Sequence, residues 1–441
     1  MTAIVTDRAT AIEQFAAHWS DIQAEEWYDA QGDHLRKLRS EGWERFTRLG
    51  FPHRGQEAWR QTSVGTISEG SFTRDAVGQL RSSELAVCGP PAVATLVLVN
   101  GVYLPELSQL ELPETVSVIP LLDDLMQGTV ARDYLGTAAI DTEHPFLALN
   151  DALWTGGVFV QGRKTDQPEA VPLHILHIGT GAQMMNQTRS LVVGEAGSKL
   201  AITESFLGQP SYAGFTNSVT ELIALDDARI AYNRLVSEGE KANHLANIFV
   251  SQRRNSKVDL FSLSHTTGLL RQEFNVDLVS EGAEINLDGL YLVNGHEHSD
   301  NRTRMAHIAP HAQSRENFRG ILDGHGEGVF NGLIVVHPDA QQTDAALSNH
   351  NLVLSDHAKV ATNPQLEIYA DDVRCTHGST VGQLEDDALF YFQTRGIDPV
   401  QARQMLVNGF ASAVVDQIAD PAFREYFANQ VTNWMTAKDQ A

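Results

Sequence analysis

The stretch Glu281-Gly-Ala-Glu-Ile-Asn-Leu-Asp-Gly-Leu-Tyr-Leu-Val293 joins a short polar turn to a run of alternating apolar residues. Successive side chains of a β-strand point to opposite faces, so Ile285 and Leu287 are predicted to face one core. The glycine that follows changes the parity, and Leu290 and Leu292 become the next inward pair. A change of facing at a glycine predicts a bend between two short strands.

The same turn-like pattern, polar residues followed by a small residue, precedes other apolar runs. It recurs at Glu195-Ala-Gly197, Asp226-Asp-Ala228, Arg254-Asn-Ser256, Glu281-Gly-Ala283, Pro310-His-Ala312, Pro338-Asp-Ala340 and Asp356-His-Ala358. The first five small residues are 31, 28, 27 and 29 residues apart, and the next step is again 28. Near-constant spacing is typical of a solenoid, whose coils bury their apolar faces only by stacking. The sequence therefore favours a β-solenoid between about residues 170 and 380, with a multi-strand sandwich as the alternative.

Helices are predicted before this region. From Asp33 to Gly50, Leu35, Leu38, Phe46 and Leu49 form one apolar stripe, and the final glycine is a typical C-terminal stop. An apolar strand is predicted at Leu96–Val102, followed by loops rich in proline. This N-terminal zone is expected to serve packing and docking rather than chemistry.

Helices are also predicted after the solenoid. One runs from Asp386 to Thr394 and stops at Gly396. Asp398-Pro399 and Asp420-Pro421 each combine an N-cap with a proline at the first helical position. The apolar faces of these two helices are Leu406, Phe410, Val414 and Ile418 in the first, and Phe423, Phe427, Val431 and Trp434 in the second. Such helices either cap the open end of the solenoid or present a face to a partner.

Composition restricts the possible partners and the cellular compartment. The 441 residues include 32 Lys and Arg and 56 Asp and Glu, a net charge of −24, which argues against nucleic-acid and anionic-membrane binding. The two cysteines, Cys88 and Cys375, exclude a disulfide scaffold and a self-contained four-thiolate site. The N-terminal residues lack the basic and apolar pattern of a secretory signal, so a cytoplasmic location is expected.

Several enzyme signatures are absent from the sequence. It contains no phosphate-binding P-loop, no nucleophile elbow and no zinc-binding H-E-x-x-H motif. His296 and His298 would share a face on a strand and could share a metal ion, with His307 and His311 nearby. The glutamate that a cupin-like iron site would add is missing, so surface or hydrogen-bonded histidines are the favoured interpretation.

A second candidate site lies in the stretch Leu366-Glu-Ile-Tyr-Ala-Asp-Asp-Val-Arg-Cys-Thr-His-Gly-Ser-Thr-Val-Gly382. Its first residues alternate as a strand that runs into an acidic turn at Asp371-Asp372. Cys375 and His377 follow two apart, so on an extended backbone they share a face. A thiolate and an imidazole suit iron, zinc or the edge of a cluster, but two ligands need further donors from another chain. The residues alone favour the alternative of a buried structural cysteine beside a turn histidine.

This stretch, together with Leu389–Ile397 and Ala402–Phe410, closely resembles the SufB/SufD family of iron–sulfur cluster assembly proteins. Ala340–Ser355 and Arg54–Ser63 match the family as well, so the resemblance extends over all three zones. It is closer to the SufD type, because SufB-type sequences carry a cysteine where this chain has Ser355-Asp-His-Ala-Lys359.

The resemblance implies a mainly β fold, with a right-handed parallel β-helix between helical terminal regions. The expected regions are 1–165, helical and mixed α/β; 166–382, the β-helix core; and 383–441, a helical domain that docks an ABC-type ATPase. It implies an assembly scaffold without catalytic activity of its own, which pairs with a SufB-like paralogue and binds a SufC-like ATPase.

Site residues are also carried over from the family. His377 is the favoured ligand or iron-handling group at the heterodimer interface, and Cys375 is the weaker candidate. The partner-binding residues are expected among Leu389, Phe390, Tyr391, Arg395, Leu406 and Phe410. Any cluster or iron would be transient and shared with the SufB-like subunit, and none would be held stably by this chain alone. ATP-driven closure of the ATPase is expected to pull on the C-terminal helices and align Cys375 and His377 with donors of the paralogue.

Two rival interpretations remain open. A carbohydrate-active β-helix protein would need paired carboxylates or bound calcium across neighbouring coils, and Asp371-Asp372 is the one obvious candidate. A purely structural scaffold would bind the ATPase without handling metal.

Overall fold

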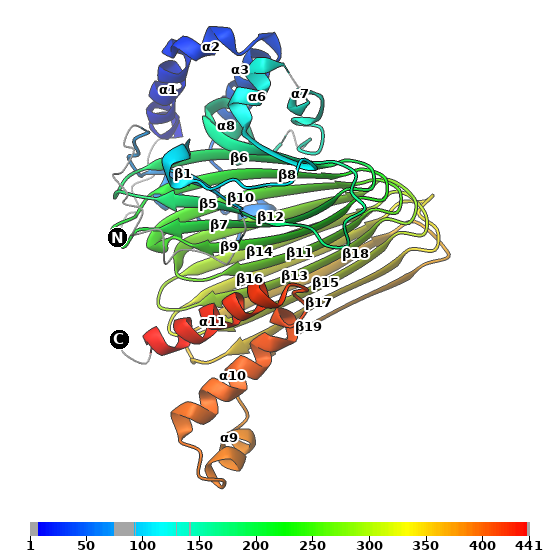
Figure 1. The fold of residues 1–441 in the computed structure, drawn as a ribbon. Helices are drawn as coiled ribbons and strands as arrows, with labels where there is room; N and C mark the ends of the chain where they lie inside the picture. The colour runs from blue at the N-terminus through cyan, green and yellow to red at the C-terminus, as the bar shows by residue number, and fades with distance from the viewer. Residues whose placement is uncertain (1–7, 75–91, 93, 129, 141–142, 439–441) are drawn as a thin grey trace.

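The computed structural model describes residues 8–74, 92, 94–128, 130–140 and 143–438. Its central feature is a parallel β-solenoid, with helices before and after it along the chain (Figure 1). The predicted mainly β fold with flanking helical regions is therefore confirmed. No helix in these ranges is long and apolar enough to cross a membrane. Cys88 lies outside the described residues.

Successive strands of the solenoid alternate between two sheets. Among the described residues, the ten-stranded sheet has the order β19-β17-β15-β13-β11-β9-β7-β5-β1-β2, and the nine-stranded sheet has the order β18-β16-β14-β12-β10-β8-β6-β4-β3. The strands of the ten-stranded sheet are β1 (Ala94–Val99), β2 (Val102–Tyr103), β5 (Pro172–Gly179), β7 (Lys199–Gly208), β9 (Arg229–Ser237), β11 (Lys257–Ser264), β13 (Glu284–Val293), β15 (Gln313–Leu322), β17 (Asp344–Val353) and β19 (Arg374–Gly382). Those of the nine-stranded sheet are β3 (Val116–Pro120), β4 (Gly156–Gly162), β6 (Met185–Gly194), β8 (Phe215–Ala224), β10 (Gly239–Gln252), β12 (Thr267–Leu278), β14 (His298–His307), β16 (Glu327–Val336) and β18 (Lys359–Ile368). From β4 onward the neighbours are parallel, which decides for the solenoid against the antiparallel sandwich.

Stacked turns explain the coil spacing. Six of the seven predicted triplets lie in turns that lead from the nine-stranded to the ten-stranded sheet, whereas Asp356-His-Ala358 lies at the opposite end, between β17 and β18. Asp227 and Asn255 have φ of 61° and 54°, a left-handed conformation that Asp and Asn tolerate better than most residues. Their N–H groups donate to the carbonyls of Arg254 and Glu281 one coil further on, at 2.9 and 3.1 Å. Each turn is thus held in register by the next.

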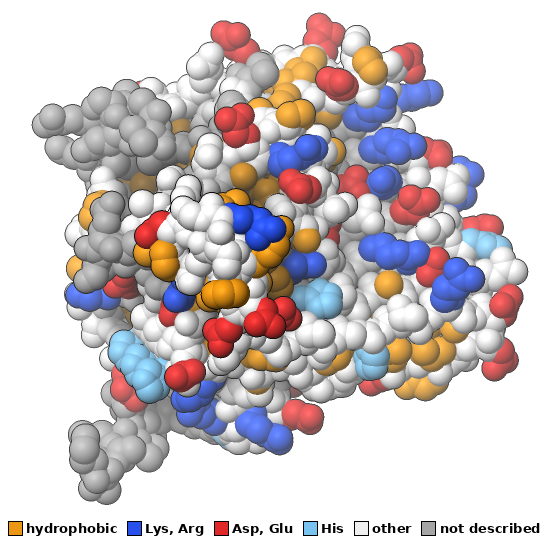
Figure 2. All heavy atoms as spheres, turned by 90° about the horizontal axis from the view of Figure 1, so that it is seen from below, with side chains coloured by type: hydrophobic (Ala, Val, Ile, Leu, Met, Phe, Trp, Pro, Cys, Tyr) orange, Lys and Arg blue, Asp and Glu red, His pale blue; other side chains and the backbone are white. Residues whose placement is uncertain are grey.

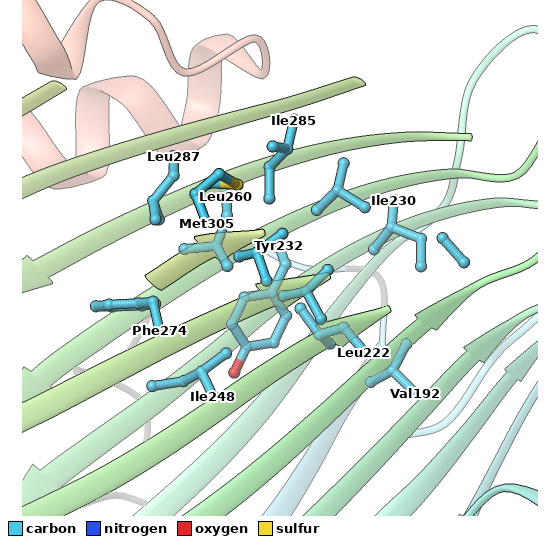
Figure 3. Close-up of a cluster of buried hydrophobic side chains, with 14 of the residues drawn as sticks. Val192, Leu222, Ile230, Tyr232, Ile248, Leu260, Phe274, Ile285, Leu287 and Met305 are labelled. Atoms are coloured by element: carbon cyan, nitrogen blue, oxygen red, sulfur yellow. The ribbon is translucent and has the colours of Figure 1, made fainter. Parts of the chain in front are cut away.

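Apolar side chains from both sheets fill the interior (Figure 3). Ile230 and Leu260 come from the ten-stranded sheet, and Leu222 and Ile248 come from the nine-stranded sheet. Burying each such side chain contributes about 1.5–3 kcal/mol. Because the contacts come largely from neighbouring coils, the coils stabilise one another.

The bend predicted at Gly289 is absent from strand β13. The strand is continuous through Gly289, and Tyr291 and Val293 continue the inward face. Leu290 and Leu292 instead face outward and pack with the C-terminal helices, so their predicted inward orientation is wrong. A Cβ at Gly289 would lie 2.2 Å from a phenylalanine ring of β15. The glycine makes room for that ring rather than for a change of parity.

The N-terminal helices cover the outer face of the nine-stranded sheet near its first strands (Figure 1). They are α1 (Arg8–Ala24), α2 (Glu26–Ala30), α3 (Asp33–Leu49), α4 (Gly65–Ser68), α6 (Leu121–Gln127), α7 (Ala131–Tyr134) and α8 (Pro145–Leu153), with short 3-10 turns at Glu57–Trp59 and Pro105–Leu107. The helix predicted from Asp33 is confirmed, and Gly50 follows it with φ of 66°. The strand predicted to reach Val102 ends at Val99, because a turn at Asn100 and Gly101 leads into β2.

The segment around Trp59 anchors the N-terminal region to the solenoid. The guanidinium of Arg271, on β12, lies 3.6 Å from the centroid of the buried Trp59 ring. Arg271 also donates to the Ala58 carbonyl at 2.8 Å and to Asp300 at 2.7 Å. Thr62 donates to the same Asp300 carboxylate at 2.6 Å. Stacking and shared hydrogen bonds therefore join residues more than 200 positions apart.

The C-terminal helices are α9 (Asp386–Gln393), α10 (Pro399–Val415) and α11 (Pro421–Lys438). The predicted cap at Asp398 is confirmed, since its carboxylate accepts from the Val400 N–H at 2.9 Å. Both α10 and α11 pack on the outer face of the ten-stranded sheet and leave the last coil uncovered, so the end-capping alternative is wrong. In α10 the buried positions include Val407 and Ala411, while Leu406 and Phe410 are half-buried.

Glu204, on β7, is the centre of a fully buried polar cluster. It accepts hydrogen bonds from Ser190 at 2.6 Å, from Thr220 at 3.1 Å and from the Tyr232 hydroxyl. His177 lies 2.9 Å from the carboxylate and the Arg234 guanidinium 3.5 Å from it. Although burial opposes ionisation, hydrogen bonding and charge from His177 and the charge of Arg234 lower the pKa of Glu204 to about 2. The carboxylate therefore stays charged inside the solenoid.

Glu316 is a second buried acid, and its pKa is shifted in the opposite direction from that of Glu204. Its side chain is buried in the stack between Leu287 and Leu347, and burial raises its pKa to about 7. Because the folded state holds this proton more tightly, its contribution to stability is complete below the usual pKa of about 4.5 and is lost as the pH rises through about 7. Glu316→Gln should therefore gain about 3 kcal/mol of unfolding free energy relative to the parent between about pH 4 and pH 8. Urea unfolding of both proteins across this range measures the difference, and a pH-independent difference would contradict the assignment.

Candidate functional site

The candidate site lies on the last coil of the solenoid. Strands β18 and β19 end the two sheets, and among the described residues each has a sheet neighbour on one side only. Most of their side chains are exposed. Tyr369, just after β18, is 63% exposed, and Val381 in β19 is 53% exposed. In Figure 1, β19 lies at the end of the stack away from the N-terminal helices. The site is thus built on an unpaired sheet edge.

Cys375 and His377 occupy alternate positions of β19, as the sequence predicted. They pair in register with Ala345 and Leu347, both of which point into the solenoid. Cys375 is half-buried and packs against the core, and His377 is exposed. Burial and the charge of Asp344 raise the pKa of the Cys375 thiol. The exposed imidazole is therefore more available than the thiol to an incoming metal ion.

The acidic turn before β19 positions this pair. The Asp372 N–H donates to the Gln341 side chain at 2.9 Å, and its carbonyl accepts from the Gln342 N–H at 2.6 Å. The Arg374 N–H then donates to the Thr343 carbonyl at 2.9 Å, which starts the pairing of β19 with β17. These bonds fix the start of β19, three residues before His377.

Cys375 and His377 alone leave the coordination of a metal ion incomplete. Across the described ranges, no group of three or more His, Cys, Asp or Glu side chains could hold a metal ion. Iron and cluster edges take thiolate and imidazole ligands, so Cys375 and His377 suit this chemistry as a partial set. The arrangement can present one or two donors at an edge, and the remaining ligands must come from another molecule.

The predicted partner-binding residues fall into two groups. On α9, Leu389 is half-buried, Phe390 and Tyr391 are 65% and 53% exposed, and the Arg395 guanidinium after the helix lies 3.5 Å from the Tyr391 ring centroid. On α10, Leu406 and Phe410 are half-buried. Arg319 of β15 lies 4.7 Å from the Phe410 ring centroid and donates to the Phe410 carbonyl at 3.1 Å. The first group projects from the body, whereas Phe410 connects α10 to the sheet.

The histidines of the H-x-H pair do not meet as a metal site would require. His296 lies in the turn before β14, whereas His298 begins that strand and contacts Thr62 at 3.0 Å. His307 is buried at 2.9 Å from Ser314, and His311 lies in a turn at the other end of the coil. The favoured interpretation, separate surface and hydrogen-bonded histidines, agrees with this geometry.

Sequence reasoning missed a different histidine group. His296, His325 and His357 stack ring on ring across three successive coils. Their separations of 29 and 32 residues are close to the coil period, so the period found in the turns was the available signal. The pattern was missed because the three lie in the turns at the opposite end from most of the predicted triplets.

Comparison with known protein families places the chain. A family model described as SUF system FeS cluster assembly, SufBD core domain, matches residues 177–410, more than half of the 441 residues. The chain belongs to the SufBD family. The model of the SufBD protein N-terminal region matches residues 9–168. The resemblance found in the sequence is therefore confirmed.

Individual SufBD relatives cover most of the chain. An iron–sulfur cluster assembly SufBD family protein of Synechocystis is 29% identical over 387 residues, 84% of each chain. The iron–sulfur cluster assembly protein SufD of Escherichia coli is 28% identical over 404 residues, 90% of this chain and 92% of its own. A chloroplastic ABCI7 protein of Arabidopsis thaliana is 30% identical over 249 residues, 56% of this chain and 52% of its own. This SufBD protein is SufD-like. Its family is one of iron–sulfur cluster assembly, so this interpretation replaces the alternative of a carbohydrate-active protein.

Proposed function

We propose that this SufBD protein is a non-catalytic assembly subunit that pairs with a SufB-like paralogue through the open end of its solenoid. The observation that carries the proposal is the uncovered last coil. A free sheet edge offers unpaired backbone groups and tends to associate with another strand. Here β18 and β19 form such an edge with the apolar residues Tyr369 and Val381 exposed beside it. A paralogue with the same fold would satisfy this edge by joining its own last coil to it.

Iron and sulfide are the substrates of this proposed interface. His377 supplies the exposed donor, and Cys375 is the second donor if its thiol is deprotonated by metal binding. The SufB-like subunit contributes the remaining ligands, so the nascent cluster is shared and transient. This sharing of ligands between the two subunits is consistent with the two donors, Cys375 and His377, that the described part of this chain provides at the edge.

The C-terminal helices are the proposed docking surface for a SufC-like ABC ATPase. Helix α9 has no buried residue and exposes Phe390 and Tyr391, and Figure 1 shows it projecting beyond the solenoid. Figure 2 shows hydrophobic side chains beside charged ones on the lower face, the side toward which α9 projects. Large exposed aromatic residues on a projecting element are typical of protein interfaces.

Helix α10 offers a mechanical link between the ATPase and the edge. Arg403 pairs with Asp323 at 2.9 Å, and Arg319 donates to the Phe410 carbonyl, so α10 is fixed to the sheet that ends in β19. ATP-driven closure of the ATPase would pull α9 and shift this sheet relative to the paralogue. The energy comes from differential binding of the two nucleotide states.

His377→Ala tests the metal-handling part of the proposal. Loss of the exposed ligand should lower the yield of reconstituted cluster at least about tenfold in the purified complex, because even indirect ligand contacts affect metal affinity by this factor. The matched control is His350→Ala, on the neighbouring strand β17 and facing away from the interior. Cluster absorbance after anaerobic addition of iron and sulfide measures the yield. An unchanged yield in an intact complex would leave the purely structural scaffold as the function.

Phe390→Asp tests the docking surface. The Phe390 ring is 65% exposed, so a carboxylate in its place should not disturb the fold. Burying that carboxylate in an apolar interface should cost free energy, because the charge loses its water. We expect binding of the SufC-like ATPase to weaken about 10- to 100-fold, as for an interface anchor residue. Calorimetric titration of the two purified proteins measures this change, with Asp386→Asn in the exposed first turn as the control. Equal affinity of Phe390→Asp and the parent would place the docking surface elsewhere.

A further inference from the structure

Three exposed histidines form a stacked column on the solenoid, which we call the histidine ladder: His296, His325 and His357. They lie in the turns that follow β13, β15 and β17. The first two ring centroids are 5.0 Å apart with planes inclined by 10°, and the second two are 4.8 Å apart with planes inclined by 7°. These distances are close to the spacing of neighbouring strands, about 4.7–4.9 Å, so the stacking of the coils sets the ladder.

The backbone beneath the ladder is held rigidly. The His325 N–H donates to the Gly295 carbonyl at 2.8 Å, which joins the first turn to the second. Ser355 Oγ donates to the Gly324 carbonyl at 2.8 Å, which joins the second turn to the third. Within the described ranges, the structure gives these three rings stacking contacts but no hydrogen bond or ion pair from their nitrogens. Three exposed imidazoles are thus placed side by side with their nitrogens available.

We propose that the histidine ladder binds one divalent transition-metal ion, such as Zn²⁺, through two neighbouring imidazoles, with water completing the coordination. Neutral imidazole is a common ligand of Zn²⁺, Ni²⁺ and Cu²⁺. With Zn–N bonds of about 2.1 Å and a tetrahedral angle, the two nitrogens must lie about 3.4 Å apart. Exposed side chains at 4.8–5.0 Å reach this separation by tilting the rings toward each other. The net charge of −24 further favours a cation.

The ladder holds a single ion because its central residue belongs to both possible pairs. His325 neighbours His296 on one side and His357 on the other, so an ion bound by either pair uses His325. No group of three or more donor side chains in the described part could hold a metal ion, which is why the site takes two protein ligands and water. Such a site is weaker than a closed structural zinc site with four protein ligands.

This site is separate from the pair on β19. The ladder follows the C-terminal ends of three strands of the ten-stranded sheet, whereas Cys375 is at the N-terminal start of β19 and pairs with Ala345 at the start of β17. The two sites therefore lie at opposite ends of the coil. The proposal does not depend on the proposed function, since the ladder binds its ion in the isolated chain.

Calorimetric titration of the full chain with Zn²⁺ tests the proposal, with Mg²⁺ as the ion that imidazoles bind poorly. We expect His325→Ala to lose one equivalent of bound Zn²⁺ relative to the parent. His296→Ala and His357→Ala should each keep that equivalent with weaker affinity, because each leaves one pair intact. The double variant of His296 and His357 should lose it. Any Zn²⁺ at Cys375 and His377 remains in all four variants and is counted separately.

His311→Ala is the matched control, since His311 is a half-exposed histidine in a turn at the other end of the coil. It should bind Zn²⁺ as the parent does. Thermal unfolding without metal should be the same in all variants, because the substituted side chains are exposed. Identical titrations of the parent and His325→Ala would overturn the proposal. Equal losses in His311→Ala and His325→Ala would also overturn it, since the binding would then belong to surface histidines in general.

Discussion

Ser379→Pro is expected to weaken pairing with the SufB-like paralogue about 10- to 100-fold. The variant lacks the N–H of residue 379, so a carbonyl of the paralogue would be buried at the interface without its donor, which costs about 1–3 kcal/mol. In a parallel strand, hydrogen bonding alternates residue by residue between the two neighbours. The Arg374 N–H donates to the Thr343 carbonyl on the β17 side, and the Thr380 carbonyl points to the same side, where it accepts from the side-chain amide of Asn351. The Ser379 N–H therefore points to the free edge, and proline removes it without breaking a bond to β17.

The control for this variant is Ser379→Val, which keeps the N–H and suits a strand. Both chains should fold alike, because proline is tolerated on an edge strand whose N–H faces outward. Analytical ultracentrifugation of each chain with the paralogue measures the affinity. If Ser379→Pro pairs as tightly as Ser379→Val, the edge of β19 is not the interface.

Glu204→Ala is expected to destabilise the folded chain by about 3–5 kcal/mol, because it leaves the buried Arg234 without its carboxylate. The Arg234 guanidinium is fully buried, 3.5 Å from Glu204 and 4.3 Å from the Phe206 ring centroid. The hydroxyls of Tyr232 and Thr220 would lose their acceptor at the same time. Urea unfolding at neutral pH measures the change.

The exposed Glu240 on β10 provides the control, and Glu240→Ala should change stability by less than about 0.5 kcal/mol. The pKa of Glu204 is lowered to about 2, so its favourable contribution is present above about pH 4.5 and is lost as the pH falls through about 2. The gap between Glu204→Ala and the parent should therefore narrow in acid. A constant gap from neutral to strongly acid pH would show that the loss is one of packing alone.

The solenoid could be predicted because its turns repeat with the coil. Residues such as Asp227 and Asn255 occupy left-handed positions that few side chains tolerate. The same residue types therefore recur in the turns at the period of the coil, and this repeat can be recognised in the sequence. The helix caps at Asp398 and Gly50 are likewise local, and local chemistry decides them.

The facing of Leu290 and Leu292 could not be predicted from their own strand. Both sides of β13 are buried at this point, one by the interior and one by the C-terminal helices, so alternation of polarity disappears. The role of Gly289 depends on a ring of the next coil, which no local pattern contains. The histidine ladder was missed for the same reason, because its members are neighbours only after the coils stack.

The shared face of Cys375 and His377 follows from their spacing alone. Their different exposure does not, because it depends on what covers β19, and the C-terminal helices leave this strand open while packing on the strands before it. The open edge is a property of the whole stack rather than of the motif.

Hydrogen exchange of the β19 amides, with and without the SufB-like paralogue, tests the central claim most directly. Backbone N–H groups along a parallel strand point alternately to its two sides, and the Arg374 N–H points to β17. The N–H groups that point to the free edge are therefore those of Cys375, His377, Ser379 and Val381. We predict rapid exchange of these four in the isolated chain and strong protection in the complex, while the alternate amides bonded to β17 change little. Unchanged exchange of all four in a complex that has demonstrably formed would contradict the account.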